Sequence, residues 1–355
     1  MSVTKDIKFD FDDLLIVPAE NSKISSRKEV NVYDSLDMLP LFTAPMDTVV
    51  GLSNIDIFKK NKIYPIVPRT VPGKLIEDLD NWFAVGLKDL ESYVTHRKSK
   101  DKSYILIDIA NGHMDKLISL VRTVKAIDDN LVLMVGNVAN PETYGHLSEA
   151  GADYVRIGVG NGGGCLTSQN VAIGYPLASL IDECYKISCT LNSPAKIVAD
   201  GGMKNYSDII KSLALGSDYV MVGSIFNKAL ESAGETVKAN VKHTGTENWT
   251  EPGEVVNQFS DNVKNAFENG AKFYKKFRGM STKGVQRELG NKEVKTSEGV
   301  IRMNPVEYTL EGWTENFTQY LASAMSYTGS KNLNEFIGKV KLVRISDNSF
   351  KRFNK

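Results

Sequence analysis

Eight short runs of apolar, mostly β-branched residues recur along the chain, and most of them are continuous rather than alternating. Continuous runs of this length are typical of parallel strands that are buried on both faces. Many of the segments between them are long enough for a helix, for example residues 115–127 and 207–215. The predicted strands cover residues 41–44, 63–68, 82–86, 104–109, 131–138, 154–159, 196–200 and 219–224.

Eight such units joined by right-handed crossovers predict an α/β fold of the closed (β/α)8 type, the TIM barrel. An open, doubly wound sheet is the alternative, and periodicity alone does not separate the two. The length of 355 residues suits one barrel of roughly 250 residues with insertions as well as two smaller domains. The eight units favour a single domain over residues 1–355.

Two segments exceed a minimal barrel. We expect residues 1–40, which precede the first strand, to cover the bottom or side of the barrel. After the last strand, residues 225–299 form a long, polar, glycine-punctuated insertion. A long insertion on the face where barrel active sites lie is typical of a mobile lid. A decorated loop without a role is the alternative.

Charge and cysteine content exclude several classes of protein. Lys and Arg together number 43, as do Asp and Glu, so the formal net charge is zero, which disfavours nucleic acid as the main partner. No apolar run approaches the roughly 18 residues of a membrane helix, and the N-terminal residues contain no signal-peptide core. With three cysteines and no disulfide framework, we expect a cytoplasmic protein without a membrane partner.

The sharpest motif is Gly158-Val-Gly-Asn-Gly-Gly-Gly-Cys-Leu-Thr167, directly after the sixth predicted strand. Its glycines leave backbone amides and carbonyls uncovered, so that the loop can hold an ion or approach a ligand closely. Cys165 is a candidate nucleophile, because free amides favour the thiolate, but a small apolar residue in a tight turn fits equally well. Cys184 and Cys189 have no partners for a metal site and are predicted to be structural.

Glycine turns also follow the seventh and eighth predicted strands, as Asp200-Gly-Gly202 and Gly223-Ser224. Barrels commonly bind phosphate with backbone amides at these two positions. We therefore predict a phosphorylated ligand, with phosphate near Gly202 and Gly223 and with Asp200 accepting hydrogen bonds from ribose hydroxyls.

Polar residues follow the first and fourth strands too, in Ala44-Pro-Met-Asp-Thr-Val49 and Asp108-Ile-Ala-Asn-Gly-His113. Both motifs place carboxylates and amides at the carboxyl ends of strands, where barrels bind their ligands. A helix cap by Asp47 or Asn111 explains either motif equally well.

Taken in order, these motifs resemble those of the IMP dehydrogenase/GMP reductase family of purine-nucleotide barrels. The resemblance runs from about residue 9 to residue 345 and fades only in the insertion after Ile225. The motifs that carry it are Phe11-Asp-Asp-Leu-Leu-Ile-Val-Pro18, Ala44-Pro-Met-Asp-Thr-Val49, Cys165-Leu-Thr167, Ile197-Val-Ala-Asp-Gly-Gly202, Val220-Met-Val-Gly-Ser224 and Arg278-Gly-Met280.

The resemblance implies that the Cys165 thiolate attacks C2 of the purine, while Thr167 and Glu298 move protons. It implies substrate contacts from Met46, Asp200, Gly202, Gly223, Ser224, Gly279, Met280 and Ser297. It implies that a nicotinamide cofactor, NADPH in the reductase branch, contacts Asp108, Ala110 and Asn111. Backbone carbonyls of Gly158, Gly160 and Cys165 would hold a monovalent cation such as K⁺. A homotetramer is implied as well.

Within the family, the chain resembles the reductase branch more than the dehydrogenase branch. Only 35 residues separate Pro68 from Tyr104, so the paired CBS module that dehydrogenases usually carry is absent. An Arg-Tyr pair on the dehydrogenase lid is replaced by Arg287-Glu288. Ala44-Pro45 and Met221-Val-Gly-Ser224 point to the dehydrogenase, whereas the reductase is favoured by residues 108–112, 174–176, 297–299 and 326–329. The expected reaction turns GMP and NADPH into IMP, ammonia and NADP⁺.

Three positions depart from the family pattern. Gly163 replaces a phosphate-binding serine, Phe277 replaces a tyrosine that often contacts phosphate, and Arg69 replaces a lysine. Arginine stays charged and cannot donate a proton near neutral pH. Three alternatives therefore remain: an IMP dehydrogenase without a CBS module, a flavin-dependent barrel oxidoreductase, and a purine-nucleotide-binding barrel without turnover.

Overall fold

The computed structural model describes residues 6–72, 81–90, 102–244, 247–290 and 292–353. One sheet contains eight parallel strands in the order β2-β9-β8-β7-β6-β5-β4-β3. Backbone hydrogen bonds from Tyr64 to Leu41 and from Thr43 to Tyr64 close the sheet between β2 and the residues just before β3. The predicted closed barrel is therefore confirmed. Its strands are β2 (Leu41–Thr43), β3 (Ile66–Val67), β4 (Trp82–Val85), β5 (Ser103–Asp108), β6 (Leu131–Val138), β7 (Tyr154–Ile157), β8 (Lys196–Asp200) and β9 (Tyr219–Val222).

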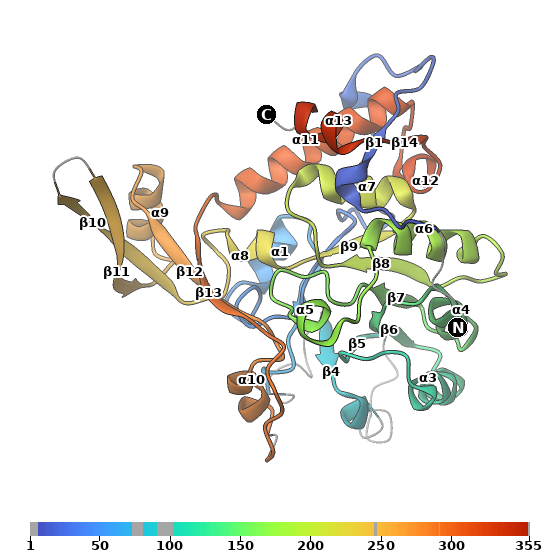
Figure 1. The fold of residues 1–355 in the computed structure, drawn as a ribbon, viewed down its shortest axis with the longest axis horizontal. Helices are drawn as coiled ribbons and strands as arrows, with labels where there is room; N and C mark the ends of the chain where they lie inside the picture. Colours follow the sequence, from blue (N-terminus) through green and yellow to red (C-terminus); the bar gives the residue numbers. More distant parts are fainter. Residues whose placement is uncertain (1–5, 73–80, 91–101, 245–246, 291, 354–355) are drawn as a thin grey trace.

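Helices surround the sheet (Figure 1). In α3, the apolar residues Leu117, Val121 and Val124 recur at helical spacing and are buried, which explains why this helix was readable from the sequence. The helices between barrel strands are α1 (Ile55–Lys60), α3 (Asp115–Ile127), α4 (Pro141–Glu149), α5 (Thr167–Val171), α6 (Leu177–Ser188) and α7 (Tyr206–Leu215), and α8 (Ser224–Asn227) follows β9.

The barrel strands bury both faces, as their continuous apolar runs predict. Ile105 and Val135 belong to the core between strands and helices, whereas their neighbours Leu106 and Met134 fill the interior of the barrel. Alternate residues of one strand thus enter two separate cores, so the barrel strands are mostly apolar, with exceptions such as Arg156 on β7.

Aromatic rings close the amino-terminal ends of the strands, and we call this layer the aromatic floor. Its members are Phe42, Tyr64, Trp82, Tyr104, Tyr154 and Tyr219, whose contacting ring centroids lie 5.0 to 6.1 Å apart. The Asp34 carboxylate accepts hydrogen bonds from the hydroxyls of Tyr64 (2.6 Å) and Tyr219 (2.9 Å). The segment before the first barrel strand therefore does reach the bottom of the barrel.

The two ends of the chain meet on the side of the barrel. Strand β1 (Leu14–Ile16) pairs antiparallel with β14 (Leu342–Arg344), and Figure 1 shows both beside α7. Phe11 and Leu14 are buried there in the outer core. The remaining elements of these segments are η1 (Phe11–Asp13), η2 (Arg27–Glu29), α11 (Leu310–Thr328), α12 (Leu333–Phe336) and α13 (Asp347–Phe353).

The insertion after β9 differs most from the sequence-based expectation. The sequence predicts no strand in residues 225–299, whereas the structure has a four-stranded antiparallel sheet in the order β11-β10-β12-β13 that projects from the barrel (Figure 1). Its last strand, β13, lies just beyond the predicted end of the insertion. Leu230, Val263 and Phe273 form a small core of its own. The elements are β10 (Thr236–Thr244), β11 (Glu247–Val256), α9 (Asp261–Glu268), β12 (Phe273–Arg278), α10 (Lys283–Glu288) and β13 (Ile301–Pro305).

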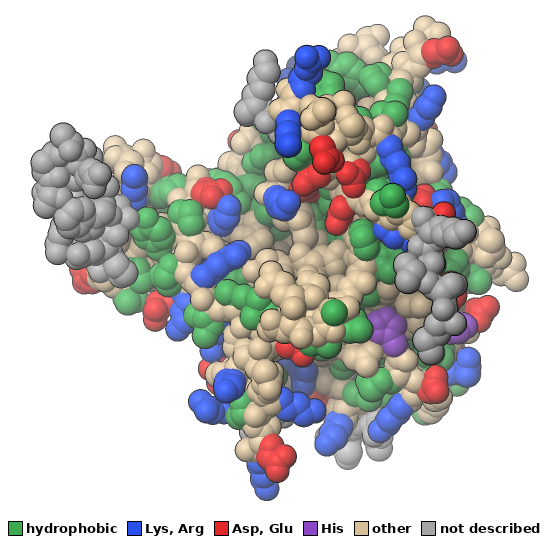
Figure 2. Space-filling view, viewed as in Figure 1, with side chains coloured by type: hydrophobic (Ala, Val, Ile, Leu, Met, Phe, Trp, Pro, Cys, Tyr) green, Lys and Arg blue, Asp and Glu red, His purple; other side chains and the backbone are tan. Residues whose placement is uncertain are grey.

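The surface agrees with the balanced composition. Acidic and basic side chains are intermingled over the face shown in Figure 2. Within the described ranges, no helix combines the length and apolarity that crossing a bilayer requires.

Candidate active site

A cavity of about 680 Å³, which we call the main cavity, is walled by the loops that follow the barrel strands and by part of the insertion. Its size is that of a typical small-molecule site. The predicted site residues in its wall are Met46, Asp108, Ala110, Gly158, Gly160, Cys165, Thr167, Asp200, Gly202, Gly223, Ser224, Gly279, Met280 and Glu298. Residues from seven separate segments of the sequence thus meet in one place.

Two predicted site residues lie outside this wall. The Asn111 side chain is exposed and its Oδ1 accepts hydrogen bonds from the backbone amide and the ring of His113. The Ser297 hydroxyl bonds to the backbone of Gly299 instead of facing the cavity. Each of these side chains is hydrogen-bonded to a neighbouring residue, and neither lines the main cavity.

The predicted catalytic residues form one hydrogen-bonded series. The Cys165 thiol donates to the Thr167 hydroxyl at 3.1 Å, and this hydroxyl donates to the Glu298 carboxylate at 2.5 Å. A thiol proton can therefore pass toward a carboxylate through one hydroxyl, which is the arrangement that an activated nucleophile needs.

Backbone pairing explains how residues so far apart in the chain meet. The Leu166 amide donates to the Glu298 carbonyl at 2.7 Å, and the Val300 amide donates to the Gly164 carbonyl at 3.1 Å. The end of the insertion thus runs antiparallel beside the loop of residues 158–167, which we call the Cys165 loop.

Close backbone contacts require glycine in the Cys165 loop. Gly158 has φ +123°, and a β-carbon there would lie 2.2 Å from the carbonyl oxygen of Asp200. At Gly201 a β-carbon would lie 3.0 Å from the backbone nitrogen of Gly162. The Cys165 loop therefore packs directly on the turn after β8 that is predicted to bind phosphate.

A buried arginine joins two of the carboxylates in the cavity wall, those of Asp108 and Asp200. Arg156 on β7 contacts Asp108 at 2.6 Å and Asp200 at 3.0 Å, and Asn137 donates to the same Asp200 oxygen at 2.8 Å. Burial opposes the charge, but the carboxylates of Asp200 and Asp108 outweigh it and raise the pKa of Arg156. Asp200 consequently keeps its second oxygen for a ligand.

Sequence reasoning missed Arg156 and Asn137, although one signal was present. Arg156 is a charge inside the otherwise apolar strand Tyr154–Ile157, and charged residues are rarely buried unless they are paired. The insertion residues Gln286, Leu289, Glu293 and Lys295, which also line the cavity, carry no comparable signal.

Two of the three carbonyls that are predicted to bind a cation already accept hydrogen bonds. The Gly158 carbonyl accepts from Asn137 at 2.8 Å, and the Gly160 carbonyl accepts from the Ser168 hydroxyl at 2.9 Å. A carbonyl oxygen has a second lone pair, so the monovalent cation stays a prediction. Within the parts of the chain that the structure describes, no group of three or more His, Cys, Asp or Glu side chains could hold a metal ion.

An ion-pair cluster fixes the insertion to the barrel. Arg278, at the end of β12, bonds through Nε to Asp47, which follows the first barrel strand, at 3.1 Å. Its Nη1 bonds to Glu288 of α10 at 2.8 Å. Hydrogen bonds from Arg278 lower the pKa of Glu288. Because Arg278 binds Asp47 and Glu288 at once, it holds β12 and α10 over the cavity.

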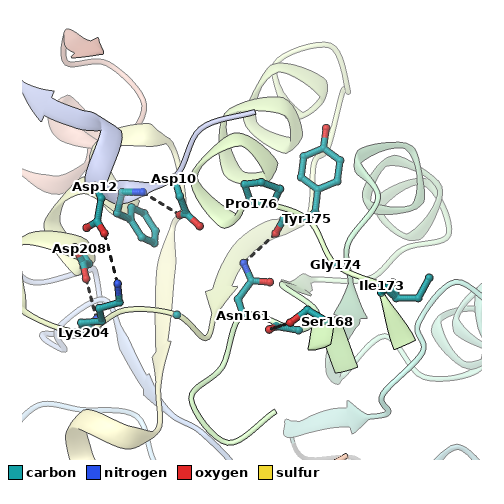
Figure 3. A pocket seen from close by; sticks show the side chains of 14 residues that line it. Asp10, Asp12, Asn161, Ser168, Ile173, Gly174, Tyr175, Pro176, Lys204 and Asp208 are labelled. Carbon is teal, nitrogen blue, oxygen red and sulfur yellow. Dashed lines mark hydrogen bonds and ion pairs between the residues drawn. The ribbon is translucent and has the colours of Figure 1, made fainter. Parts of the chain in front are cut away.

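A second cavity, of about 630 Å³, is lined in part by the Cys165 loop, and Figure 3 shows the side chains around it. Gly160, Asn161 and Gly202 line both cavities. In Figure 3 the Asn161 side chain donates to the Tyr175 carbonyl at 2.9 Å, and Lys204 pairs with Asp12 at 3.5 Å. None of the predicted catalytic residues lines this cavity, so the main cavity is the candidate active site.

Comparisons with known proteins identify relatives of the chain. The family model described as IMP dehydrogenase / GMP reductase domain matches residues 83–247. A GMP reductase of Buchnera aphidicola subsp. Schizaphis graminum is 26% identical over 380 residues, which cover 100% of this chain and 99% of the relative. A GMP reductase of Caenorhabditis elegans is 26% identical over 96% of this chain and 92% of its own length. A GMP reductase of Streptococcus pneumoniae is 31% identical over 65% of this chain and 74% of its own length.

Proposed function

The chain belongs to the IMP dehydrogenase / GMP reductase family, and from that premise we propose that it is a GMP reductase, which converts GMP and NADPH to IMP, ammonia and NADP⁺. The observation that carries the proposal is the series Cys165–Thr167–Glu298 in the wall of the main cavity. The full-length similarity to proteins named GMP reductase supports the same reaction.

The chemistry begins at the thiol. Cys165 gives its proton to Thr167, whose own proton passes to Glu298, and the resulting thiolate adds to C2 of the purine. Glu298 returns the proton through Thr167 to the exocyclic amine, which leaves as ammonia. Cleavage of the carbon–sulfur bond at the end of the reaction frees Cys165 and releases IMP.

The other wall residues bind and orient the nucleotide. The free oxygen of Asp200 accepts hydrogen bonds from ribose hydroxyls, and the backbone at Gly202, Gly223 and Ser224 receives the phosphate. Met46, Gly279 and Met280 border the purine.

In this proposal the nicotinamide cofactor lies against the part of the cavity that is lined by Asp108 and Ala110. NADPH supplies the hydride that replaces the departed amine at C2. Arg156, bonded to both Asp108 and Asp200, keeps the cofactor and ribose sides of the cavity in a fixed relation.

Further parts of the proposal concern the whole molecule. Residues 1–355 act as one domain in which the insertion, residues 225–299, is a lid that supplies Glu298, Gly279 and Met280 to the site. The family premise adds a cytoplasmic homotetramer and a monovalent cation beside the Cys165 loop.

One assay separates this proposal from an IMP dehydrogenase without a CBS module. The protein is incubated with GMP plus NADPH, and separately with IMP plus NAD⁺, while nicotinamide absorbance and ammonia are followed. We expect NADPH oxidation coupled to ammonia release, and little XMP from IMP, because Glu288 pairs with Arg278 and no tyrosine stands beside Arg287 to activate water. XMP formation without any response to GMP would overturn the reductase proposal. A yellow, flavin-containing protein would overturn both readings, and tight GMP binding without turnover would indicate a binding protein.

A further inference from the structure

We propose that Arg302, which lies in the insertion sheet outside the barrel, binds the 5′-phosphate of the nucleotide. The proposal rests on the proposed function in one respect, namely that a purine 5′-nucleotide occupies the main cavity. It makes the sheet a part of substrate recognition, whereas the backbone turns after β8 and β9 belong to the barrel.

The register of the sheet brings Arg302 to the Cys165 loop. On β13, Arg302 pairs with Phe277 of β12, and its guanidinium carbon lies 5.0 Å from the centroid of the Phe277 ring. Its Nη2 lies 3.3 Å from the position of a β-carbon on Gly163. Both Phe277 and Gly163 line the main cavity, so the exposed guanidinium lies next to two residues of the wall, although Arg302 itself is not one of the lining residues.

The position next to Gly163 also brings the guanidinium near the turn after β8, which is proposed to bind phosphate. Gly162, the preceding residue, packs on Gly201 of the turn after β8, and Gly202 and Gly223 line the same cavity. A phosphate bound to these turns therefore lies next to the loop that Arg302 touches. A larger side chain at position 163 would occupy the space next to the guanidinium.

Charge is the second argument. Within the described ranges, Arg302 has no ion pair and donates no hydrogen bond to the protein, so its donors are available to a ligand. Stacking on Phe277 holds the guanidinium by its face and leaves the N–H groups along its edge free. A guanidinium edge matches a phosphate with two parallel hydrogen bonds.

Of the other cations near the cavity, Arg69 donates a hydrogen bond to the Asp108 carbonyl at 3.2 Å, and Lys295 lines the wall from the segment after α10. Arg156 is bonded to Asp108 and Asp200, and Lys204, next to Gly202, points to Asp12 (Figure 3). The backbone amides of the turns carry only partial charges. Among the described residues, Arg302 is the cation without an ion pair that lies beside Gly163 and Phe277, and the Phe277 ring, which has no hydroxyl, serves to orient it.

The test compares a nucleotide with its nucleoside. Arg302→Ala should weaken the binding of GMP about ten- to a hundredfold, as expected for lost hydrogen bonds between charged groups, and leave guanosine binding unchanged. Arg302→Lys should restore part of the affinity because it keeps the charge without the paired donors. In turnover, KM for GMP should rise while kcat changes little.

Arg344→Ala is the matched control, because Arg344 stacks on Phe9 in the same way, 4.2 Å from the ring centroid, but on the side of the barrel. Lys204→Ala tests the neighbouring cation. Neither control should change the affinity for GMP more than about twofold, which is within the usual effect of surface substitutions.

Binding is measured by calorimetry without nicotinamide, so the outcome does not depend on the reaction. A wild type that binds GMP more tightly than guanosine but never oxidises NADPH overturns the reductase and leaves the role of Arg302 standing. Unchanged GMP affinity in Arg302→Ala, or an equal loss for GMP and guanosine, overturns the role of Arg302 and leaves the reductase standing.

Discussion

The two ends of the barrel are built from opposite kinds of residue. The amino-terminal end is filled by the aromatic floor, where Phe42 contacts four other rings. The carboxyl end is lined by glycines, by Cys165 and by charged side chains such as Arg156. Large buried rings stabilise the fold, whereas a glycine-rich wall buries little apolar area and leaves backbone groups free for a ligand.

This difference shows that one end of the barrel mainly stabilises the fold and that the other end mainly forms the cavity. Near the carboxyl end the buried groups include an ionisable one: Lys275, fully buried at the base of the insertion, donates to the carbonyls of Ser232 and Gly234. Burying a charge opposes folding. Substitutions at the floor should therefore change stability, and substitutions at the cavity should change activity.

The largest effect is expected at Cys165. Cys165→Ala should still bind GMP but lose essentially all turnover, with the loss in kcat rather than KM, because no other group can form the bond to C2. The unfolding midpoint should stay near that of the wild type. Mass spectrometry of enzyme trapped with substrate should find the adduct on the peptide that contains Cys165. Retention of more than a few per cent of the activity would sink the covalent mechanism.

Glu298 should show a smaller effect on the same step. Glu298→Gln keeps the shape of the side chain and removes its ability to take the proton that Thr167 passes on, so kcat should fall about 10²- to 10⁴-fold. GMP affinity, measured by calorimetry, should be nearly unchanged. A variant with normal kcat would show that Glu298 only anchors the loop through its backbone bond to Leu166.

At the floor the expectation reverses. Phe42→Ala removes a ring that is 1% exposed and should lower the free energy of unfolding by about 3–5 kcal/mol, measured by urea denaturation. The activity of the folded fraction should match the wild type. Phe353→Ala is the control, since that ring is 65% exposed. Equal loss of stability in both variants would contradict the division between the two ends.

A pH effect should come from Lys275. Burial lowers the pKa of Lys275 to about 7, against the opposing attraction of Glu231. Between pH 7 and 9 the unfolded chain therefore holds a proton that the folded chain has lost, so stability should rise with pH, by at most about 1.4 kcal/mol per pH unit.

Lys275→Met should remove that slope, because methionine does not titrate. Urea unfolding at several pH values measures the free energy of unfolding of both proteins. The difference between the two curves removes the contribution of the titratable groups that both proteins contain. If wild type and variant show the same slope, Lys275 does not titrate in this range.

The smallest effects are expected at the two other cysteines. Cys184 is fully buried, and burial raises its pKa, whereas Cys189 is exposed. Both alanine variants should keep full activity, and stability should fall by about 1 kcal/mol for Cys184→Ala and by less for Cys189→Ala. Loss of turnover in either variant would show that Cys165 is not the sole reactive thiol.

Local pattern determined much of the fold. Strands 131–138 and 196–200 and the helix at 115–127 have the predicted bounds, because burial on both faces or on one helical face imposes its period on consecutive residues. The glycine turns were readable for a similar reason, since a positive φ or a close contact excludes other residue types at Gly158 and Gly201.

The tertiary structure alone decided which distant residues meet. No strand was readable in the insertion, because β12 alternates buried Phe273, Lys275 and Phe277 with polar residues, and a buried lysine hides that period. Glu298 entered the site through resemblance, but its bond to Thr167 spans 131 positions. The ion pairs of Arg156 with Asp108 and Asp200 and the position of Arg302 next to Gly163 likewise depend on how distant segments fold back onto the barrel. A local sequence pattern cannot predict such long-range contacts.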